Sequence, residues 1–564
     1  MGATENRCGG ISAEMCIRSC ARNRNPRQDY STIQTPWGPE TLDNKTPSSD
    51  GAGNAAGGQT AIVQHLAMPG VLGVSAPKRM MTHGAYVFLV GDRAYKLKRD
   101  VKYSYMDFST QAQRDAAALA EIRINRRTAP DLYLGVAPVF NNGGDIRIGD
   151  VSDKLMASAQ EHLVVMRRFD ETQTLDVLAD AGAVDGALAE RLAVQIAQFH
   201  SAAPGMVVDG AATKLASISG RTMRDLVAGV DALGEQIIAK LHEAMQATLI
   251  QALSEVDERG QAGLVRRLHG DLHLGNVALI EGAPVIFDAL EFDDAMATVD
   301  VLHDAAFLGM DLWTRGLQDA AARMWSRYLA ERRDYSGLAL APVFFSMRAA
   351  VRAKTALHRA GLTEGEEAAA SLTEAQRYAE AALALLERPS SRLVAIGGLS
   401  GSGKTTIART LAPSLAVAGG AVHIRSDVIR KLQQGVPAEE KLPPGAYTKD
   451  ASAAVYKGMF EAAADCLKQS APVILDAVFA DEAERAQAEA VANRINVPFD
   501  SIWLDCEAGA RQDRVADRTG DASDATPEVA ARQAEYDLGT MHWRRILGDD
   551  DAPAAAKRVL KLPR

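Results

Sequence analysis

The chain has 564 residues, a formal net charge of -10, and 47% hydrophobic and 24% charged residues. At this length two or three domains are expected, each able to bury a core. The acidic balance disfavours a nucleic-acid binder, which usually carries a basic patch. No apolar run approaches the roughly 18 residues needed to cross a bilayer, and the first 30 residues lack the apolar centre of a signal peptide. We therefore expect a cytoplasmic protein.

The first predicted segment, residues 1–65, is rich in Gly, Asn, Ser, Thr, Pro and Arg. It has too little apolar surface to offset the entropy lost on ordering, so a disordered extension is expected. Five cysteines in a chain of this length predict no disulfide framework. Three of them cluster in this segment without a nearby His or fourth Cys, and are interpreted as incidental instead of metal ligands: Cys8, Cys16 and Cys20.

A β-hairpin is predicted near the start of the folded region. Apolar residues 86–90 precede the turn dipeptide Gly91-Asp92 and the alternating stretch 93–98, a pattern typical of two antiparallel strands. Strand geometry puts Lys96 and Lys98 on one face. Either a strand lysine binds the phosphates of ATP, or both lysines are solvated on an outer face.

Strong helix formers follow at 111–127, with Glu121 near the middle of the segment, and a helix is expected there. A kinase needs such a helix glutamate to hold the strand lysine in place. Residues 133–140 and 146–148 predict two further strands. The stretch 161–169 resembles the strand and hinge that join the two lobes of a kinase, so the order of elements favours the functional interpretation of the lysine.

Residues 170–265 are rich in Ala and Leu with helical periodicity, and helices are expected to continue to Leu386. His200 closes one of these helices and is interpreted as a packed structural residue. Asp300 and Asp304 are interpreted as structural carboxylates that cap helices or form ion pairs within the helical lobe.

The loop 269–276 is the strongest indication of catalysis in this half of the chain. Asp271 precedes Asn276 by five positions, and the apolar stretch 285–287 then ends at Asp288. This spacing supplies a carboxylate that can act as a base and two Mg²⁺ ligands. Because Gly and Asp also favour turns, the loop alone could be structural. The second carboxylate, at the end of a strand, favours a kinase active site.

A phosphate-binding loop is predicted in the C-terminal part. Apolar residues 393–396 lead into GxxxxGK[ST] and then into a helical pattern from Ile407, which is the context this motif requires. Backbone N–H groups of such a loop surround phosphates, Lys404 reaches the outer phosphates and Thr405 can ligate Mg²⁺. The predicted nucleotide-binding residues are Gly398, Leu399, Ser400, Gly401, Ser402, Gly403, Lys404, Thr405 and Thr406.

A mostly parallel sheet is expected around this loop. One of its strands ends at Asp476, which is a second candidate Mg²⁺ ligand. The stretches predicted to form strands are 421–424, 473–476, 501–504 and 559–562.

The segment 425–430 resembles small-molecule P-loop kinases and kinase-type toxins. This resemblance implies that Asp427 contacts the acceptor hydroxyl and deprotonates it; a helix N-cap is the alternative. Arg511, Arg514 and Arg518 fall at i, i+3 and i+7, on one helical face. They resemble lid arginines that stabilise charge on the transferring phosphate, and a solvated basic face is the alternative.

Taken together, Lys96, Glu121, the loop 269–276 and the segment 287–292 resemble the aminoglycoside phosphotransferase group of protein-kinase-like folds. The similarity covers roughly residues 66–386 and is greatest to bacterial chains that fuse such a domain to a P-loop ATPase.

The resemblance implies that Lys96 binds the ATP phosphates with Glu121 as its partner. It also implies that Asp271 is the general base toward a substrate hydroxyl, while Asn276 and Asp288 hold Mg²⁺. The chain departs from the pattern in two ways. No GxGxxG precedes the lysine, so the turn at 82–86 must cover the phosphates, and Leu274 stands where related drug kinases carry Pro.

The expected fold is an α+β two-lobed kinase-like domain followed by an α/β P-loop domain. The predicted ranges are 66–160 for the N-lobe, 161–388 for the helical C-lobe and 389–564 for the P-loop domain. The expected function is a bifunctional ATP- and Mg²⁺-dependent phosphotransferase acting on small-molecule hydroxyls. The alternatives are one catalytic domain with a regulatory ATP-binding domain, or a nucleic-acid end kinase built on the P-loop domain.

Overall fold

The computed structural model of the protein describes residues 56–72, 77–103, 106–142, 145–388, 390–518 and 520–562. Cys8, Cys16, Cys20 and most of the predicted N-terminal extension lie outside these residues, as does Pro389 at the predicted domain boundary. Among the described helices, none combines the length and the apolar character needed to cross a membrane.

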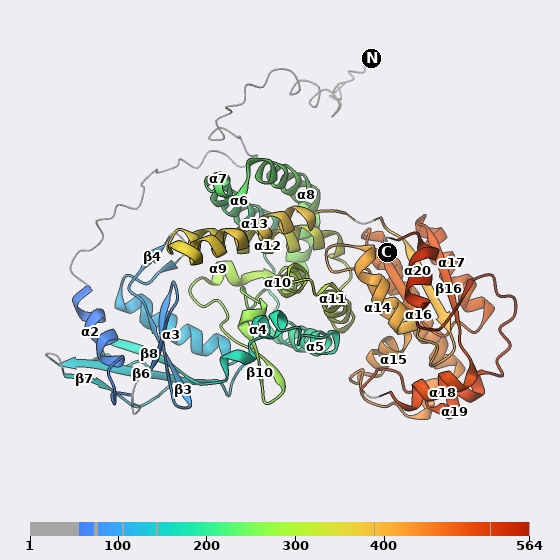
Figure 1. Ribbon diagram of the computed structural model, residues 1–564, viewed down its shortest axis with the longest axis horizontal. Helices are drawn as coiled ribbons and strands as arrows, with labels where there is room; N and C mark the ends of the chain where they lie inside the picture. The colour runs from blue at the N-terminus through green and yellow to red at the C-terminus, as the bar shows by residue number, and fades with distance from the viewer. Residues whose placement is uncertain are drawn as a thin grey trace, which may run out of the picture. The chain divides into compact units, whose positions relative to one another are not determined.

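A six-stranded antiparallel sheet with the strand order β1-β2-β3-β8-β6-β7 forms the N-lobe (Figure 1). The predicted hairpin is confirmed: Val90 pairs with Arg93 across a two-residue turn, in which Gly91 has a φ of 54°. Glycine adopts this left-handed conformation without strain. The strands of the N-lobe are β1 (Lys78–Met81), β2 (Ala85–Val90), β3 (Arg93–Lys98), β4 (Lys102–Tyr103), β5 (Met106–Asp107), β6 (Tyr133–Asn142), β7 (Asp145–Ile148) and β8 (Glu161–Arg167).

Helix α3 (Gln111–Asn125) is the helix expected at 111–127, and it packs against this sheet (Figure 1). It begins with a capping box, in which the side chains of Thr110 and Gln113 each accept a hydrogen bond from the other's backbone N–H. Ala118 and Ile122 on its inner face pack with Val164 of β8. The helix therefore has a fixed position over β3 and β8.

The predicted boundary between the two lobes, at 160/161, falls just before strand β8. Strand β8 pairs with β3 on one side and with β6 on the other, so residues 161–167 belong to the N-lobe sheet. A continuous apolar strand of this kind gives no local sign of its partners, because pairing is decided by residues distant in sequence.

The predicted extension 1–65 overlaps a helix at its C-terminal end. Helix α2 spans Ala56–Leu66, and Ile62, Val63 and Leu66 pack in one apolar cluster with residues of the N-lobe sheet. The side chain of Gln59 donates to the carbonyl of Lys98 at 2.8 Å and accepts from a backbone N–H of the same loop. The sequence did not predict this helix, because it has few apolar residues and follows directly on a Gly-rich stretch.

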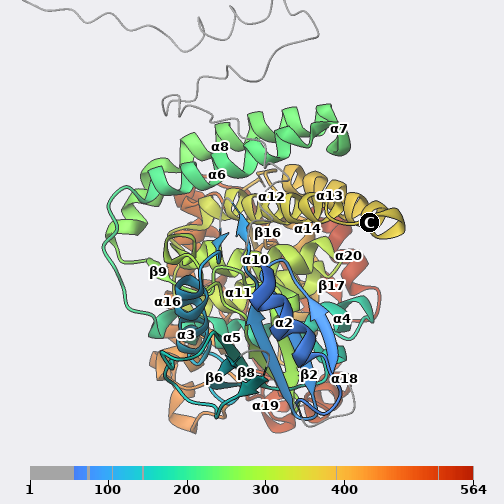
Figure 2. The same cartoon turned by 90° about the vertical axis from the view of Figure 1, so that its left-hand side faces the viewer.

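The helical lobe follows β8. Both views show α6 beside α8 and α12 beside α13 (Figures 1 and 2). Its helices are α4 (Leu175–Asp180), α5 (Gly186–Ala202), α6 (Ala211–Ala228), α7 (Val230–Leu233), α8 (Glu235–Gln261), α9 (Asp294–Ala297), α10 (Val301–Thr314), α11 (Gln318–Arg332), α12 (Ala341–Ala360) and α13 (Gly365–Ala384). Its short strands are β9 (Val265–Arg267), β10 (Val277–Ile280), β11 (Ala283–Ile286) and β12 (Thr298–Asp300).

A buried ion cluster ties α8 to the start of α10. Asp300 caps α10 by accepting a hydrogen bond from the backbone of Leu302 at 2.8 Å, as expected of a structural carboxylate. Its side chain also pairs with Arg259, which pairs in turn with Asp334. All three charged side chains are at least 93% buried, so the arginine neutralises two carboxylates that have little access to water.

Replacing Arg259 by Met should lower the free energy of unfolding by about 3–5 kcal/mol, because it leaves Asp300 and Asp334 buried without their cation. Urea denaturation followed by tryptophan fluorescence measures the change. The exposed Arg221 on α6 provides the matched control, and Arg221→Met should shift the midpoint little. A loss below about 1 kcal/mol for Arg259→Met would mean that the two carboxylates find other partners.

The C-terminal domain is built on a five-stranded parallel sheet with the order β14-β15-β13-β16-β17. This confirms the expected α/β architecture. Its strands are β13 (Leu393–Gly398), β14 (Val422–Arg425), β15 (Val473–Asp476), β16 (Phe499–Asp505) and β17 (Arg544–Leu547). Its helices are α14 (Lys404–Leu415), α15 (Ser426–Gln434), α16 (Lys449–Lys468), α17 (Glu482–Ile495), α18 (Ala508–Ala516), α19 (Pro527–Gln533) and α20 (Ala552–Leu560).

The strand expected at 559–562 is wrong. The first two residues of that stretch end helix α20, because the Ala-rich run before it favours a helix and Pro553 stands in the first turn. The fifth strand is instead β17, at the edge of the sheet. Three of its four residues are exposed, so it lacks the apolar run that marks a buried strand.

Helix α11 contacts both domains. Ser326 accepts a hydrogen bond from the backbone of His423 on β14 at 3.1 Å. A Cβ added to Gly419 would lie 2.6 Å from the ring of Trp325, so only glycine permits this approach. One continuous apolar core includes helical-lobe residues as well as Leu393 and Phe479. Residues before and after position 389 therefore pack together in one core, so the two domains are in direct contact.

Candidate active sites

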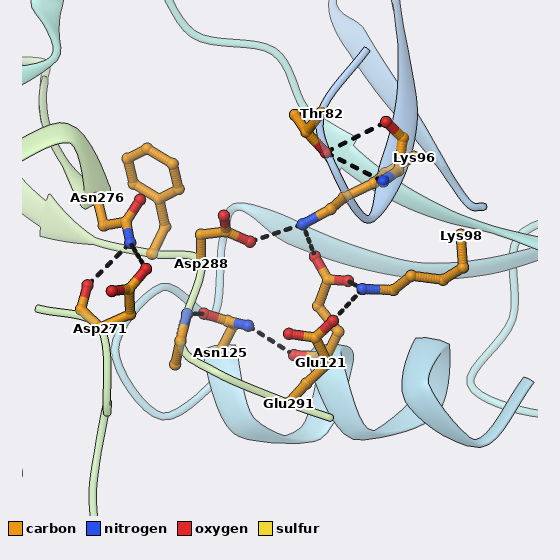
Figure 3. Close-up of polar contacts among 12 residues, drawn as sticks. Thr82, Lys96, Lys98, Glu121, Asn125, Asp271, Asn276, Asp288 and Glu291 are labelled. Atoms are coloured by element: carbon orange, nitrogen blue, oxygen red, sulfur yellow. Dashed lines mark hydrogen bonds and ion pairs between the residues drawn. The ribbon is translucent and has the colours of Figure 1, made fainter. Parts of the chain in front are cut away.

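A network of charged side chains joins β3, α3 and Asp288, which lies two residues after the end of β11 (Figure 3). Lys96 Nζ lies 2.9 Å from Glu121 Oε1 and 2.6 Å from Asp288 Oδ1. Lys96, Glu121 and Asp288, which were expected to act together, thus meet in one place, although Lys96 and Asp288 are 192 residues apart in sequence. Glu121 is completely buried, whereas the side chain of Asp288 is 41% exposed.

A second lysine completes this network. Lys98 Nζ lies 2.5 Å from Glu121 Oε2 and also pairs with Glu291 (Figure 3). The sequence placed Lys98 on the same face as Lys96 but gave it no partner. Glu291 was included in the segment 287–292 but was given no role from the sequence. A second carboxylate only three residues after Asp288, in a chain with two lysines on one strand face, could have indicated that it pairs with the second lysine.

The loop expected to carry the base brings Asp271 and Asn276 together. Asn276 Nδ2 donates to the backbone carbonyl of Asp271 at 2.9 Å and to its carboxylate at 3.3 Å (Figure 3). The side chain of Asp271 is 43% exposed, so a substrate hydroxyl can reach it. His273 Nε2 lies 3.5 Å from the same carboxylate.

Asp304 fixes the backbone at the start of the loop 269–276 by hydrogen bonds. Its two carboxylate oxygens accept the backbone N–H groups of His269 at 3.2 Å and Gly270 at 2.9 Å. Arg348 donates to the carbonyl of Gly270 at 3.0 Å. His200 bonds Asp304 through Nε2 at 3.2 Å and is completely buried. Both His200 and Asp304 are therefore structural, as expected, although the sequence did not connect them with the catalytic loop.

The backbone at Asp288 is unusual. Its φ is 58°, in the left-handed region that residues other than glycine rarely adopt. Its N–H donates to the hydroxyl of Tyr133 at 3.1 Å, and the next N–H, of Ala289, donates to Asn125 Oδ1 at 2.8 Å. Residues of the N-lobe thus hold this strained turn and direct the carboxylate of Asp288 toward Lys96.

The charges in this site stabilise one another. Burial disfavours the ammonium of Lys96, but the carboxylates of Asp288 and Glu121 outweigh it and raise its pKa well above the ordinary value. Burial likewise opposes ionisation of Asp288, and Lys96 with Lys98 still lowers its pKa. For Asp271 burial is outweighed mainly by His273, so the pKa of this carboxyl also falls. Both carboxyls are ionised at neutral pH.

The donor set fits Mg²⁺. Asp288 offers a carboxylate and Asn276 an amide oxygen, and oxygen donors are what this ion prefers. Kinase sites need only one or two protein carboxylates because the substrate phosphates supply further oxygens. The turn expected to cover the phosphates is closed by Thr82, whose Oγ1 accepts the N–H of Ala85 at 3.0 Å (Figure 3).

The second candidate site is the loop between β13 and α14. Gly401 and Gly403 have φ values of 84° and 95°, and a Cβ on Gly401 would lie 2.3 Å from the carbonyl of Arg511. The loop therefore requires glycine to keep its curled backbone. Lys404 Nζ donates to the carbonyl of Leu399 at 3.1 Å, and Ser402 Oγ is buried without a hydrogen-bond partner. This arrangement fits a phosphate cradle.

Thr405 and Asp476 lie together at the end of β15. The threonine hydroxyl donates to Asp476 Oδ2 at 2.7 Å, and His423 Nε2 lies 3.1 Å from the same oxygen. Burial opposes ionisation of Asp476, but His423 and Arg425 lower its pKa. The hydroxyl and carboxylate oxygens of this pair fit a Mg²⁺ site beside the phosphates.

Asp427 lies inside the first turn of α15, whose N-cap residue is Arg425. The alternative in which Asp427 caps the helix is therefore wrong. Burial raises its pKa, and the opposing positive charges of Arg425 and Lys404 reduce this effect. Asp521, which follows the three predicted lid arginines in sequence, lies against the same region, because it pairs with Arg425 at 2.8 Å.

The three predicted lid arginines do not share one helical face. Helix α18 ends at Ala516, so Arg518 lies beyond it. The guanidinium of Arg514 donates to the carbonyl of Gly548 at 2.8 Å, and Arg511 is buried and donates to the carbonyl of Ala530. Burial lowers the pKa of Lys404, Asp476 and Asp427 raise it, and the positive charge of Arg518 lowers it further. Of the three, Arg518 is the one whose charge is among the main influences on the pKa of Lys404.

Two family descriptions match this chain. Residues 86–340 match the phosphotransferase enzyme family, and residues 393–536 match an AAA domain. Among solved structures, aminoglycoside 2'-phosphotransferase-IIIa in its GDP complex covers 54% of this chain and 92% of its own, with 15% identity and a TM-score of 0.33. A gluconokinase from Sinorhizobium meliloti covers 31% of this chain and 91% of its own, with 20% identity and a TM-score of 0.23.

Two mycobacterial relatives extend over both domains. An uncharacterized protein of Mycobacterium tuberculosis is 31% identical over 470 residues, which are 81% of this chain and 90% of that protein. An uncharacterized protein of Mycobacterium bovis matches with the same values. The chain therefore belongs to the same family as these mycobacterial proteins, and in it a domain of the phosphotransferase enzyme family is fused to a P-loop kinase domain.

Proposed function

We propose that the chain is an ATP-dependent phosphotransferase with two active sites, each moving the γ-phosphoryl group of ATP to a hydroxyl of a small molecule. The observation that carries this proposal is the half-exposed carboxylate of Asp271, bonded to Asn276. A regulatory nucleotide site would need the lysine network but not a reachable base.

In the kinase-like domain, Lys96 binds oxygens of the ATP phosphates, and Glu121 keeps its ammonium in place. Asp271 orients the acceptor hydroxyl and takes its proton as the new oxygen–phosphorus bond forms and the bond to the β-phosphate breaks. Asn276 and Asp288 would hold Mg²⁺, which supplies charge neutralisation at the phosphates when bound.

In the P-loop domain, the backbone N–H groups of residues 398–404 surround the phosphates, and Lys404 binds the outer ones. Thr405 and Asp476 would hold Mg²⁺ there. Asp427 is the proposed base for the second acceptor, since it stands at the C-terminal end of β14, where ligands of parallel sheets bind. Arg518 is proposed to stabilise the transferring phosphoryl group, and Arg514 stays a sequence-based prediction in that role.

A second candidate function is catalysis by the kinase-like domain with nucleotide sensing by the P-loop domain. Helix α11 favours it, because Tyr328 of α11 bonds His200 near the catalytic loop while Ser326 bonds His423 near Asp476. Filling of the P-loop could thus change the position of the catalytic loop.

The test is a screen of hydroxylated and amino-bearing metabolites, aminoglycosides included, with the full chain, Mg²⁺ and ATP. Mass spectrometry detects the phosphorylated product. We expect one acceptor whose phosphorylation is lost in Asp271→Asn and another whose phosphorylation is lost in Lys404→Ala. If a single acceptor responds to both substitutions, the P-loop domain is regulatory; if no acceptor is phosphorylated, the proposal fails.

The two sites should also differ in their dependence on pH. A general base must be deprotonated to act. The pKa of Asp427 is raised, chiefly by burial, whereas that of Asp271 is lowered because His273 outweighs burial. As pH falls, turnover by the P-loop site should therefore decline before turnover by the kinase-like site. Profiles of kcat/KM for each acceptor between pH 4 and 8 measure this order, and coinciding acid limbs would contradict it.

A further inference from the structure

A small cavity lies where the helical lobe meets the P-loop domain. Helices α5 and α11 supply Glu190 and Arg323 to its wall, and the P-loop domain supplies Arg409 of α14 and Arg425 of β14. The cavity is therefore complete only when both domains are present. None of the proposed catalytic or phosphate-binding residues lines it.

The charged residues that line this cavity are mostly arginines. Four arginines contribute to it, the fourth being Arg327, and Glu190 is the only carboxylate among the described lining residues. Glu190 bonds both Arg323 at 2.8 Å and Arg409 at 2.9 Å. Carboxylates outside the lining also pair with these arginines: Asp521 with Arg425, and Glu331 and Glu439 with Arg327. Arg409 shares its partner Glu190 with Arg323, so the positive charge of Arg409 is the least compensated in the lining and can attract an anion.

Two guanidinium groups in the lining have unsatisfied donors. The Nε–H groups of Arg409 and Arg425 are buried and have no hydrogen-bond partner. The side chain of Arg425 is 90% buried, and its Nε lies 3.8 Å from Asp476, which is too far for a hydrogen bond. Buried donors are nearly always paired in folded proteins, so two orphaned donors on arginines that line one cavity point to a ligand that accepts hydrogen bonds.

The size of the cavity limits this ligand. Its volume is about 40 Å³, and one water needs about 10–15 Å³ measured in this way. About three or four oxygen atoms fit, as in a phosphate, a sulfate or the carboxylate end of a larger molecule. Arginine matches such planar or tetrahedral oxyanions with paired hydrogen bonds.

We propose that this cavity is an anion site shared by the two domains, which binds a phosphate or carboxylate group through Arg409, Arg425 and Arg323. Glu190 opposes the anion and also positions Arg323 and Arg409 while the site is empty. The same chemistry can come from a free anion or from the anionic end of the acceptor of the P-loop domain, since Arg425 is two residues from Asp427.

The test is calorimetric titration of the full chain with inorganic phosphate. Saturating Mg²⁺ and a non-hydrolysable ATP analogue are present throughout, so that neither nucleotide site can take up the phosphate. We expect one phosphate per chain. Arg409→Gln should weaken binding at least tenfold, whereas Glu190→Gln should strengthen it about threefold or more because the opposing charge is removed. Arg221→Gln, on the exposed surface of α6, should change nothing.

Because the two substitutions should change the phosphate affinity in opposite directions, their effects can be distinguished from those of misfolding. A damaged protein loses affinity in both variants, and a weaker affinity in a folded Glu190→Gln chain would overturn the proposal. Absence of phosphate binding, or equal affinity in wild type and a folded Arg409→Gln chain, would overturn it as well. If Arg409→Gln fails to fold, the gain or loss in Glu190→Gln decides alone.

A second measurement distinguishes the two sources of the anion, and only this part rests on the proposed function. Phosphate is added as an inhibitor while the acceptor of the P-loop domain is varied at saturating ATP. Competitive inhibition assigns the site to the anionic end of that acceptor. Any other pattern assigns it to a separate anion. If no acceptor of the P-loop domain exists, the titration result still stands.

Discussion

Replacing Asp271 by Asn should lower acceptor-dependent ATP turnover of the kinase-like domain by about 10²–10⁴-fold, the usual contribution of a general base. The amide has the shape of the carboxylate and can still accept the hydrogen bond from Asn276 Nδ2, which is 3.3 Å long in the native chain. It cannot take up the proton of the acceptor. Binding of ATP should persist, because Lys96 keeps Glu121 and Asp288 as partners.

The measurement is best made in a Lys404→Ala background, so that only the kinase-like domain turns over ATP. Asp145→Asn is the matched control, since that carboxylate is exposed at the start of β7 and pairs only with Arg147 among the described residues. Its kcat should be unchanged. Turnover within threefold of the control in the Asp271→Asn chain would show that another group takes the proton.

Replacing Lys404 by Ala should reduce the number of tight nucleotide sites per chain from two to one. A charge-assisted hydrogen bond contributes about 1.5–3 kcal/mol, so affinity at the P-loop should fall about 10- to 150-fold. The ammonium donates to the carbonyl of Leu399 in the loop itself. The loop should keep its shape without the lysine, because the conformation depends on Gly401 and Gly403.

Equilibrium titration with a fluorescent ATP analogue gives both the number of sites and their affinities. Lys468→Ala serves as control, because that lysine is exposed at the end of α16 and pairs with Asp465 one turn away. It should leave both sites intact. Two sites of native affinity in the Lys404→Ala chain would exclude the loop 398–404 as a phosphate cradle.

Local patterns were enough to predict the elements that carry the chemistry. The period of two along β3 placed Lys96 and Lys98 on one face, and both meet Glu121 of the predicted helix. The Gly-rich loop after an apolar strand likewise has the context that its motif requires. In both cases spacing within a few residues decides the geometry.

Contacts between distant segments could not be predicted in this way. The carboxylate of Asp304 accepts two N–H groups of the catalytic loop from 34 and 35 residues away, and Glu190 bonds Arg409 across 219 residues. Strand β8 lies between β3 and β6 for the same reason. Such partners are chosen when the whole chain packs, and a single sequence carries no periodic sign of them.

The packing around α11 has a consequence for the synthesis of this protein. Trp325 and Ser326 use residues beyond 389 as partners, and at 5–20 residues per second residues 389–564 need about 10 to 35 s to be translated. During that interval the nascent N-terminal domain exposes the α11 surface that β14 later covers. Chains truncated near 388 keep it exposed permanently and should aggregate, whereas co-expressed halves should reassemble.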